Sequence, residues 1–281
     1  MKFVTLINGV KMPILGFGTW PLKGNDLKIA FKYSYEEGCR LYDTANRYAN
    51  EWDLGDAIRE FNVNKDELFI TSKIDAIRFN GNKRFLYLNA KSVKRAYKES
   101  CKRLGTDRID LYLLHSPFKN YIKAYGQLLE LYNRGLVRAI GVCNCDVVHL
   151  ELIKQTYGVY PMINQIELHL LNQQKRVVQY CQEHNIQVQA FSPFTKGEMF
   201  KELFNNDKLL SIAKTHNKSV AQIIIRWIIQ RDIVVIPSSS SKAHIEDNYN
   251  VFDFELSDVE MRNLSEMDRK QSYCDYVQVI V

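Results

Sequence analysis

Four polar residues, Asp43, Tyr48, Lys73 and His115, lie at or just beyond the ends of short apolar runs. A buried ammonium is costly unless a carboxylate pairs with it, and Asp43 is a suitable partner for Lys73. An ammonium beside a phenol would draw the pKa of Tyr48 from about 10 toward neutral pH and make it a general acid. His115, neutral or partly protonated, would then hold a carbonyl oxygen in line with the phenolic hydrogen.

Each of these residues also has a structural interpretation. A single Asp or His at a strand end usually caps a loop, and a single Lys usually faces solvent. The combination of the four residue types therefore carries more weight than any one of them.

The spacing of apolar residues predicts the elements that position these side chains. Short apolar runs, expected as strands, occupy residues 14–18, 40–43, 68–72, 109–114, 137–142, 162–166, 187–191 and 233–236. Segments with helical spacing lie between them, such as 92–104, 121–134, 173–184 and 220–230. Runs that are apolar on both faces indicate parallel strands covered by helices, and eight such units close a barrel. The strand ends then share one rim, on which distant polar residues meet.

We therefore predict an α/β fold, a single (β/α)8 TIM barrel that spans residues 1–281 as one domain. An N-terminal β-hairpin is expected at residues 3–14, with Asn8-Gly9 in a tight type I′ turn, and a C-terminal loop is expected over the active-site face. An open, doubly wound sheet is the competing architecture. No G-x-G-x-x-G turn follows any strand, which argues against it.

Composition narrows the function classes. The net charge of +6 is spread along the chain without a long basic run, so we expect no nucleic-acid partner. We expect no membrane partner either, because no apolar run reaches membrane-spanning length and the N-terminus shows no export signal. The six cysteines lack paired spacing, which indicates a reducing compartment and the cytoplasm. Cys143, Cys145 and His149 could be read as zinc ligands, but their spacing lacks a C-x-x-C knuckle.

Along most of its length the chain resembles the aldo-keto reductases. The matching segments are 6–13, 15–20, 42–48 (Tyr-Asp-Thr-Ala-Asn-Arg-Tyr), 68–73, 109–115, 140–142, 164–167, 221–227 and 235–237. The resemblance places the family's tetrad on Asp43, Tyr48, Lys73 and His115. It implies reduction of an aldehyde or ketone by hydride transfer from NAD(P)H, with Tyr48 as general acid and no metal. The expected partner is a small carbonyl substrate, and the expected assembly is a monomer or weak dimer.

The resemblance also implies which residues contact the cofactor and which contact the substrate. Asn144 and Gln165 would bind the carboxamide, Phe191 would stack on the nicotinamide ring, and Ser192, Pro193 and Phe194 would approach the pyrophosphate. The full set of expected cofactor contacts is Gly18, Thr19, Trp20, Asp43, Cys143, Asn144, Gln165, Phe191, Ser192, Pro193, Phe194, Ser238, Ser239, Ser240, His244, Asp247 and Asn248. The expected substrate contacts are Trp20, Tyr48 and His115.

The chain departs from the family pattern at several of these positions. Cys143 replaces a usual Ser and Phe191 a frequent Tyr, and both changes look tolerable. Ser238 and His244 replace the Lys and Arg that commonly clamp the 2′-phosphate of NADPH. Hydroxyls at 238–241, Lys242 and His244 retain some phosphate recognition, so NADPH is expected first and NADH is the rival. A polar loop with no cofactor role is the structural interpretation of the serine run.

The substrate pocket departs as well. Ile74-Asp75 and Ser116 stand where the family often has aromatic residues, which leaves Trp20 as the matched aromatic wall of a wider, more polar pocket. The somewhat long segment 74–91 carries Arg78, Lys83, Arg84, Phe85 and Tyr87 and is expected to overhang the site. These features predict a bulky or acidic carbonyl substrate.

Two rival functions remain open at this point. A non-catalytic nicotinamide-binding or structural protein could use the same fold, although nothing structural requires all four tetrad residues. A metal-dependent barrel hydrolase could use Asp43 and His115, but it would normally show clustered His-x-His ligands.

Overall fold

The computed structural model describes residues 2–75, 77–80, 83–86 and 90–274. Within these residues, eight strands form one parallel sheet, in the order β3-β4-β5-β8-β9-β10-β11-β12. The strands are β3 (Phe17–Gly18), β4 (Leu41–Asp43), β5 (Phe69–Ile74), β8 (Ile109–Leu114), β9 (Val137–Cys143), β10 (Ile163–Glu167), β11 (Gln187–Phe191) and β12 (Val234–Val235). They match the apolar runs of the sequence to within a few residues at each end.

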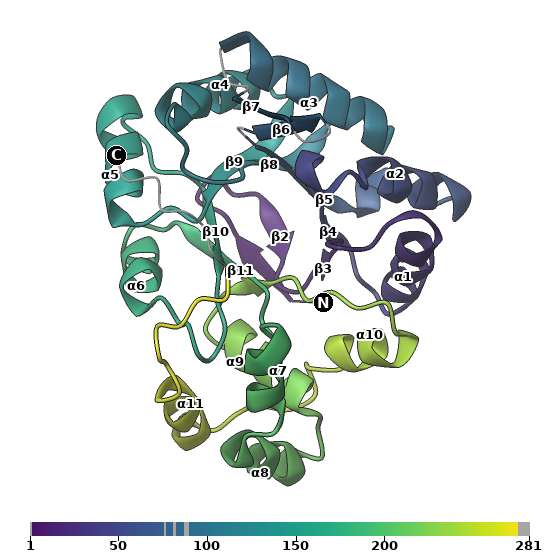
Figure 1. Cartoon of the computed structure of the whole chain (residues 1–281), viewed down its shortest axis with the longest axis vertical. Coiled ribbons are helices and arrows are strands. Elements are labelled where there is room, and N and C mark those ends of the chain that lie inside the picture. Colours follow the sequence, from purple (N-terminus) through teal and green to yellow (C-terminus); the bar gives the residue numbers. More distant parts are fainter. Residues whose placement is uncertain (1, 76, 81–82, 87–89, 275–281) are drawn as a thin grey trace.

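The sheet curls until its first and last strands meet. Leu15 forms a parallel bridge with Val235, and the Val235 amide donates to the Ile14 carbonyl while the Gly16 amide donates to the Val235 carbonyl, both at 2.9 Å. The architecture is thus the predicted (β/α)8 barrel rather than an open sheet. Figure 1 shows the strands as a ring with helices around it.

The helices of the described chain cover the barrel on its outer side (Figure 1). The α-helices are α1 (Gly24–Glu36), α2 (Glu51–Glu60), α3 (Ala90–Leu104), α4 (Tyr121–Asn133), α5 (Val147–Tyr157), α6 (Lys175–Glu183), α7 (Gly197–Phe204), α8 (Asp207–His216), α9 (Val220–Ile229), α10 (Lys242–Tyr249) and α11 (Asp258–Ser265), and the 3₁₀ turns are η1 (Asn46–Tyr48) and η2 (Lys65–Glu67). Among the described residues, no helix is both long enough and apolar enough to cross a membrane.

Burial on both faces explains why most residues of these strands are apolar. Every residue of β5 and of β8 is buried, as expected for strands between a barrel interior and a helical layer. The polar exception in β8, Asp110, has partners on both sides: its carboxylate accepts hydrogen bonds from the Ile70 amide and from Arg138, each at 2.9 Å. Pairing of this kind is what makes a buried carboxylate tolerable.

The N-terminal hairpin forms, but its turn differs from the prediction. β1 (Phe3–Thr5) pairs antiparallel with β2 (Lys11–Pro13), which leaves residues 6–10 as the loop. Only Gly9 in this loop has a positive φ, +82°, whereas a type I′ turn needs two such residues, so the predicted type I′ turn is wrong. Leu6 is buried and the Asn8 side chain donates to the Arg138 carbonyl at 2.9 Å. Packing of residues 6–10 against the barrel therefore favours a longer loop than a two-residue turn.

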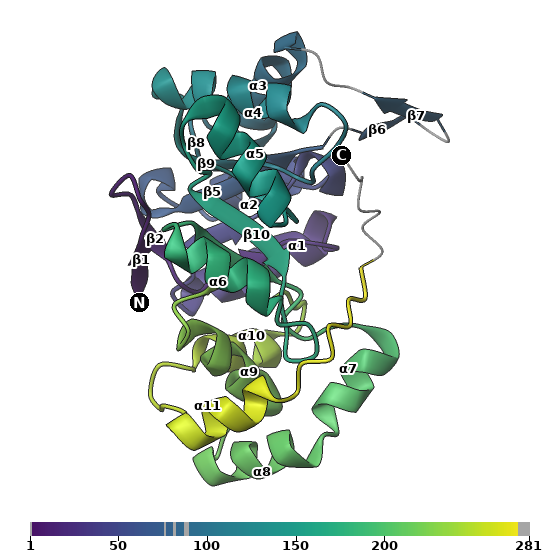
Figure 2. The same cartoon turned by 90° about the vertical axis from the view of Figure 1, so that its left-hand side faces the viewer.

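A second hairpin interrupts the barrel between β5 and α3. It consists of β6 (Ile77–Asn80) and β7 (Lys83–Leu86), which pair antiparallel. Figure 2 shows it projecting on the side opposite the N-terminal hairpin. The side chains expected to overhang the site, those of Arg78, Lys83, Arg84, Phe85 and Tyr87, lie outside the described part of the structure, so the overhang stays a prediction.

Candidate active site

The tetrad residues converge over the C-terminal ends of three neighbouring strands. Asp43 is the last residue of β4, Lys73 lies near the end of β5, and His115 directly follows β8. Tyr48 ends the 3₁₀ turn η1 that continues from β4. Because these strands pair in parallel and in register, the three ends meet on one rim.

Lys73 is the centre of this cluster. Its side chain is fully buried, and Nζ donates to the Asp43 carboxylate, to the Thr44 carbonyl at 3.0 Å and to the Tyr48 hydroxyl at 3.2 Å. The rings of Tyr48 and His115 meet edge to face, with centroids 5.5 Å apart. One ammonium thus bridges a carboxylate and a phenol next to an imidazole.

Burial decides the charge states here as much as the neighbouring charges do. Burial opposes the charge on Lys73, but the Asp43 carboxylate and the neighbouring Tyr48 and Cys143 together outweigh it and raise the pKa of Lys73 above its ordinary value. Burial raises the pKa of Tyr48 to about 12, although the Lys73 ammonium acts in the opposite direction. The expected fall of the Tyr48 pKa toward neutral pH is therefore wrong for the protein without ligand. Tyr48 is a protonated phenol at neutral pH.

His115 is neutral in this environment. Burial, followed by the charges of Lys73 and Arg47, lowers the pKa of His115 well below its ordinary value. Its Nδ1 lies 3.7 Å from the Asp75 carboxylate, too far for a hydrogen bond. A neutral imidazole can donate a hydrogen bond from one nitrogen, as the positioning of a carbonyl oxygen requires.

Two amide side chains lie next to the tetrad, that of Asn144 directly after β9 and that of Gln165 within β10. The Gln165 Nε2 donates to Asp43 at 2.7 Å and to Gln189 at 3.1 Å, which fixes its orientation. Asn144 has a positive φ of 56°, and its backbone N–H donates to the backbone carbonyl of Gln165 at 2.9 Å. Its side-chain Nδ2 is buried and has no hydrogen-bond partner among the described residues. A buried donor without a partner is costly, so this amide suits a ligand that supplies a carbonyl.

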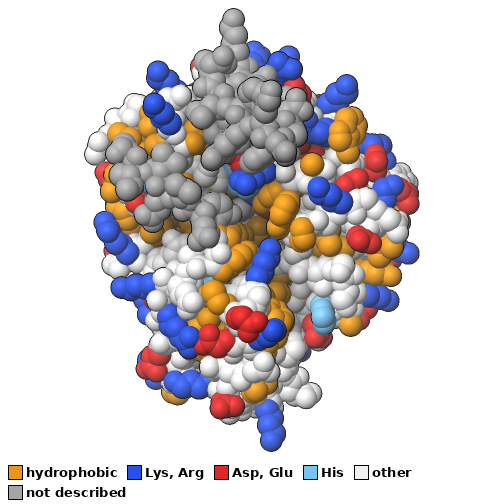
Figure 3. All heavy atoms as spheres, in the orientation of Figure 1, with side chains coloured by type: hydrophobic (Ala, Val, Ile, Leu, Met, Phe, Trp, Pro, Cys, Tyr) orange, Lys and Arg blue, Asp and Glu red, His pale blue; other side chains and the backbone are white. Residues whose placement is uncertain are grey.

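A cavity of about 350 Å³ opens above these residues, a size that suits a small ligand. Figure 3 shows hydrophobic side chains gathered at the centre of this face with Lys and Arg beside them. Among the predicted site residues, those that line the cavity are Gly18, Trp20, Asp43, Tyr48, His115, Phe191, Ser192, Pro193, Phe194 and Ser238. Six further residues line the cavity that were not predicted from the sequence, which are Arg47, Thr195, Lys196, Ile236, Tyr273 and Cys274.

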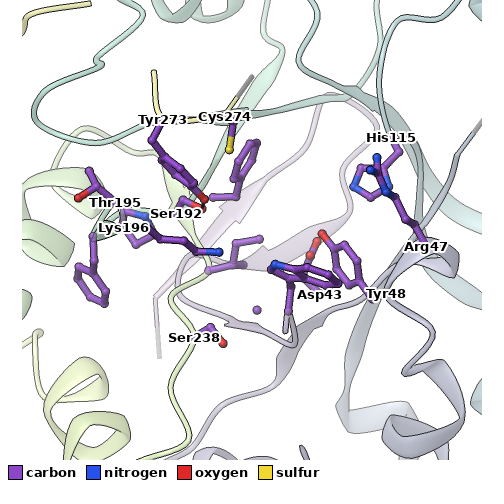
Figure 4. Close-up of a pocket in the computed structure, with 16 residues that line it drawn as sticks. Asp43, Arg47, Tyr48, His115, Ser192, Thr195, Lys196, Ser238, Tyr273 and Cys274 are labelled. Atoms are coloured by element: carbon purple, nitrogen blue, oxygen red, sulfur yellow. Dashed lines mark hydrogen bonds between the residues drawn. The ribbon is translucent and has the colours of Figure 1, made fainter. Parts of the chain in front are cut away.

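The loop after β11 forms one wall of the cavity. Ser192 and Thr195 both have positive φ angles, 53° and 61°, which turn the backbone sharply before helix α7. Lys196, the residue before α7, extends this wall and lies near the Tyr273 ring, with Nζ 5.7 Å from its centroid. Figure 4 shows Ser192, Thr195, Lys196 and Tyr273 together, across the cavity from His115 and Arg47.

The remaining predicted cofactor residues do not line the cavity. Thr19 is buried, and its hydroxyl accepts a hydrogen bond from Asn50. Cys143, Asn144 and Gln165 lie at β9 and β10, and Ser239, Ser240, His244, Asp247 and Asn248 follow Ser238 along the loop into α10. Asn248 is buried, whereas His244 and Asp247 are exposed. Ser241 caps the helix by accepting from the His244 amide.

The C-terminal segment closes over the cavity, as the fold prediction expected. The buried Glu167 carboxylate accepts hydrogen bonds from the Ser272 hydroxyl at 2.7 Å, the Tyr273 amide at 2.9 Å and the Cys274 amide at 3.1 Å. Burial opposes ionisation of Glu167, but hydrogen bonds from His169, Ser272 and Tyr273 outweigh it and lower the pKa of Glu167 below its ordinary value. The Tyr273 hydroxyl lies 2.5 Å from the Ser192 hydroxyl. Tyr273 thus supplies an aromatic wall in addition to Trp20.

The candidate zinc ligands serve other contacts. Cys143 Sγ lies 3.8 Å from Gln165 Oε1, and His149 caps helix α5 together with Asp146. Within the described residues, no group of three His, Cys, Asp or Glu side chains could hold a metal ion.

Fold and site together define a barrel enzyme whose pocket lies at the carboxyl ends of the strands. Residues 14–269 match the family model described as Aldo/keto reductase family. The chain is 40% identical to the 9,11-endoperoxide prostaglandin H2 reductase of Trypanosoma cruzi (strain CL Brener), covering 94% of this chain and 91% of the relative. It is 39% identical to the glyoxal reductase of Bacillus subtilis (strain 168), covering 95% and 93%.

Solved structures agree with these sequence matches. MGS-M4, an aldo-keto reductase from a Medee basin deep-sea metagenome library, superimposes with a TM-score of 0.91 at 36% identity, over 99% of each chain. An aldo-keto reductase complexed with NADPH gives a TM-score of 0.88 at 29% identity, over 96% of this chain and 89% of that one. The chain belongs to the aldo/keto reductase family and is an oxidoreductase that acts on carbonyl compounds.

Proposed function

We propose that this enzyme reduces an aldehyde or ketone to the alcohol with a nicotinamide cofactor and with Tyr48 as the proton donor. The observation that carries the proposal is the position of Tyr48, whose hydroxyl faces the cavity 3.2 Å from the Lys73 ammonium. A phenol is a weak acid, and an adjacent ammonium stabilises the phenolate that remains after the proton has left.

The cavity walls suit such a cofactor. Beside the cavity, Gln165 and the Asn144 side-chain amide, whose Nδ2 has no hydrogen-bond partner in the described part of the chain, would bind the carboxamide. Phe191, on the cavity wall, would stack on the nicotinamide. The turn at Ser192 to Lys196 offers backbone amides, hydroxyls and one ammonium to a pyrophosphate. When bound, the reduced cofactor would supply a hydride, which is a proton with two electrons, to the carbonyl carbon.

The chain's own residues complete the reaction. His115 holds the carbonyl oxygen, and Tyr48 transfers its proton to that oxygen as the C–H bond forms. The tyrosinate that results is stabilised by Lys73 and regains a proton from solvent. The carbonyl is reduced to the alcohol with the hydride that the bound cofactor would supply, and the proton on the alcohol oxygen comes from the phenol.

For the cofactor we propose NADPH, with NADH as the alternative. The NADPH complex of a family member at 29% identity supports this choice. Ser238 lines the cavity, and Lys242 and His244 follow on the exposed start of α10. These residues would give weaker recognition of a 2′-phosphate than a Lys and Arg clamp. A cytoplasmic location and a monomeric or weakly dimeric state belong to the same proposal, and size-exclusion chromatography tests the second.

The test uses tryptophan fluorescence followed by turnover. Trp20 is 46% exposed and lies 5.2 Å from the Tyr48 ring, whereas Trp52, 47% exposed, belongs to α2. NADPH should quench the fluorescence of the Trp52→Phe variant and have little effect on the Trp20→Phe variant. Oxidation of the tighter-binding cofactor is then followed with a carbonyl panel that includes glyoxal and methylglyoxal. Absence of both cofactor binding and carbonyl-dependent oxidation would contradict the proposal.

A further inference from the structure

Arg47, the residue before Tyr48, places a positive charge at the mouth of the cavity. It lies in η1 and lines the cavity with Tyr48 and His115. Its side chain is 47% exposed, and its Nη1 lies 3.2 Å from the Asp75 carboxylate, whose side chain is only 5% exposed. A buried carboxylate thus contacts one side of the guanidinium, and nearly half of the side-chain surface of this cavity-lining residue is exposed.

The charge of Arg47 acts on the reacting end of the pocket. Arg47 contributes, after burial and Lys73, to the lowered pKa of His115. Figure 4 shows Arg47 beside His115 and Tyr48, with Ser192, Thr195 and Lys196 on the other side of the cavity. The proposed pyrophosphate site lies on that other side, so a substrate group is in a better position to reach Arg47 than a cofactor phosphate.

We propose that Arg47 is a specificity-determining residue that selects carbonyl substrates bearing a carboxylate, such as aldehyde acids and oxo acids. This inference rests on the proposed reductase function and names the substrate class of the same site. A guanidinium presents five N–H donors in one plane, and a carboxylate accepts two of them side by side. Recognition by this fork requires direct contact between the two groups.

Asp75 sets the scale of the effect. Its negative charge offsets part of the Arg47 charge at long range, so the attraction for an anionic substrate is short-ranged and directional. The interaction is also partly exposed and is screened by salt. We therefore expect Arg47 to act on KM for the anionic substrate more than on kcat.

The experiment compares two substrates that differ mainly in charge, 4-carboxybenzaldehyde and its methyl ester. In Arg47→Met, KM for the acid should rise about tenfold or more, while KM for the ester changes less than about twofold. Arg47→Lys, which keeps the charge without the fork, should give an intermediate value. The control is Arg134→Met, which removes an exposed arginine at the end of α4. It should leave KM for the acid and KM for the ester unchanged. Equal changes for acid and ester would overturn the inference.

A binding measurement separates this inference from the reductase proposal. Benzoate binding is titrated through quenching of the Trp20 fluorescence, with no turnover involved. Benzoate affinity about tenfold lower in Arg47→Met than in the wild type supports the carboxylate site, even if no carbonyl compound is reduced. Equal benzoate affinity in both proteins overturns it. Thermal unfolding of each variant checks that it stays folded at the assay temperature, because Arg47→Met also removes a counter-ion of the buried Asp75.

Discussion

The Lys73 ammonium lies 3.2 Å from the Tyr48 hydroxyl and donates in addition to the buried Asp43 carboxylate. The same cation therefore neutralises a buried carboxylate and faces the proposed proton donor. Lys73 thus has a structural role, as the counter-ion of Asp43, and a chemical role beside Tyr48. Substitutions can separate these two roles.

Lys73→Met should destabilise the fold because it leaves Asp43 buried without its counter-ion. Removal of one partner from a buried ion pair costs about 3–5 kcal/mol. The double variant Lys73→Met/Asp43→Asn removes both charges and should recover part of this loss. Urea unfolding of the three proteins measures the free energies. A free energy of unfolding of Lys73→Met within about 1 kcal/mol of the wild-type value would show that the Lys73–Asp43 pair contributes little to stability.

The depressed pKa of His115 predicts a specific pH dependence of stability. The folded protein keeps His115 neutral below its ordinary pKa of 6.5, whereas the unfolded chain takes up a proton there. The free energy of unfolding therefore decreases as the pH falls from about 6.5 toward 5. In the variant His115→Gln this decrease should be smaller than in the wild type. Urea unfolding at pH 7 and pH 5 gives the comparison. An NMR titration midpoint near 6.5 for His115 would contradict the account.

Glu167 should control the order of the C-terminal segment. Glu167→Gln replaces a carboxylate that accepts from Ser272, Tyr273 and Cys274 by a neutral amide with one acceptor oxygen. Hydrogen bonds to a charged group contribute about 1.5–3 kcal/mol, so amide hydrogen exchange at Tyr273 and Cys274 should accelerate at least tenfold. The control is Glu183→Gln at the exposed end of α6, which should leave their exchange unchanged. Unchanged exchange in Glu167→Gln would show that other contacts hold the segment.

The barrel and the meeting of the tetrad could be predicted because they depend on local patterns. Buried parallel strands must be apolar, so their ends can be recognised from the sequence, and polar residues at those ends share a rim. The type I′ turn was wrong because burial of Leu6, a tertiary contact, sets that loop. The direction of the Tyr48 pKa shift was wrong for a similar reason. Its largest cause is burial, which the sequence does not show.

The cavity-lining residues that were not predicted lie in loops and turns, where the sequence has no regular spacing of apolar residues that would indicate their direction. The direction of the Arg47 side chain depends on the 3₁₀ turn η1, and a sequence pattern does not specify it. Tyr273 reaches the pocket because Glu167, distant in sequence, binds its amide. The cofactor contacts expected in the loop after β11 end at Phe194, but the turn at Thr195 brings Lys196 to the cavity as well.

The most direct test of the account is the variant Tyr48→Phe, which removes the phenolic oxygen and keeps the ring that packs against Trp20 and His115. Carbonyl-dependent oxidation of the cofactor is measured together with cofactor affinity from tryptophan quenching. We predict that reduction is lost, by at least about a hundredfold, while the dissociation constant of the cofactor changes less than about threefold. Carbonyl reduction at a rate close to that of the wild type would contradict the assignment of Tyr48 as the proton donor.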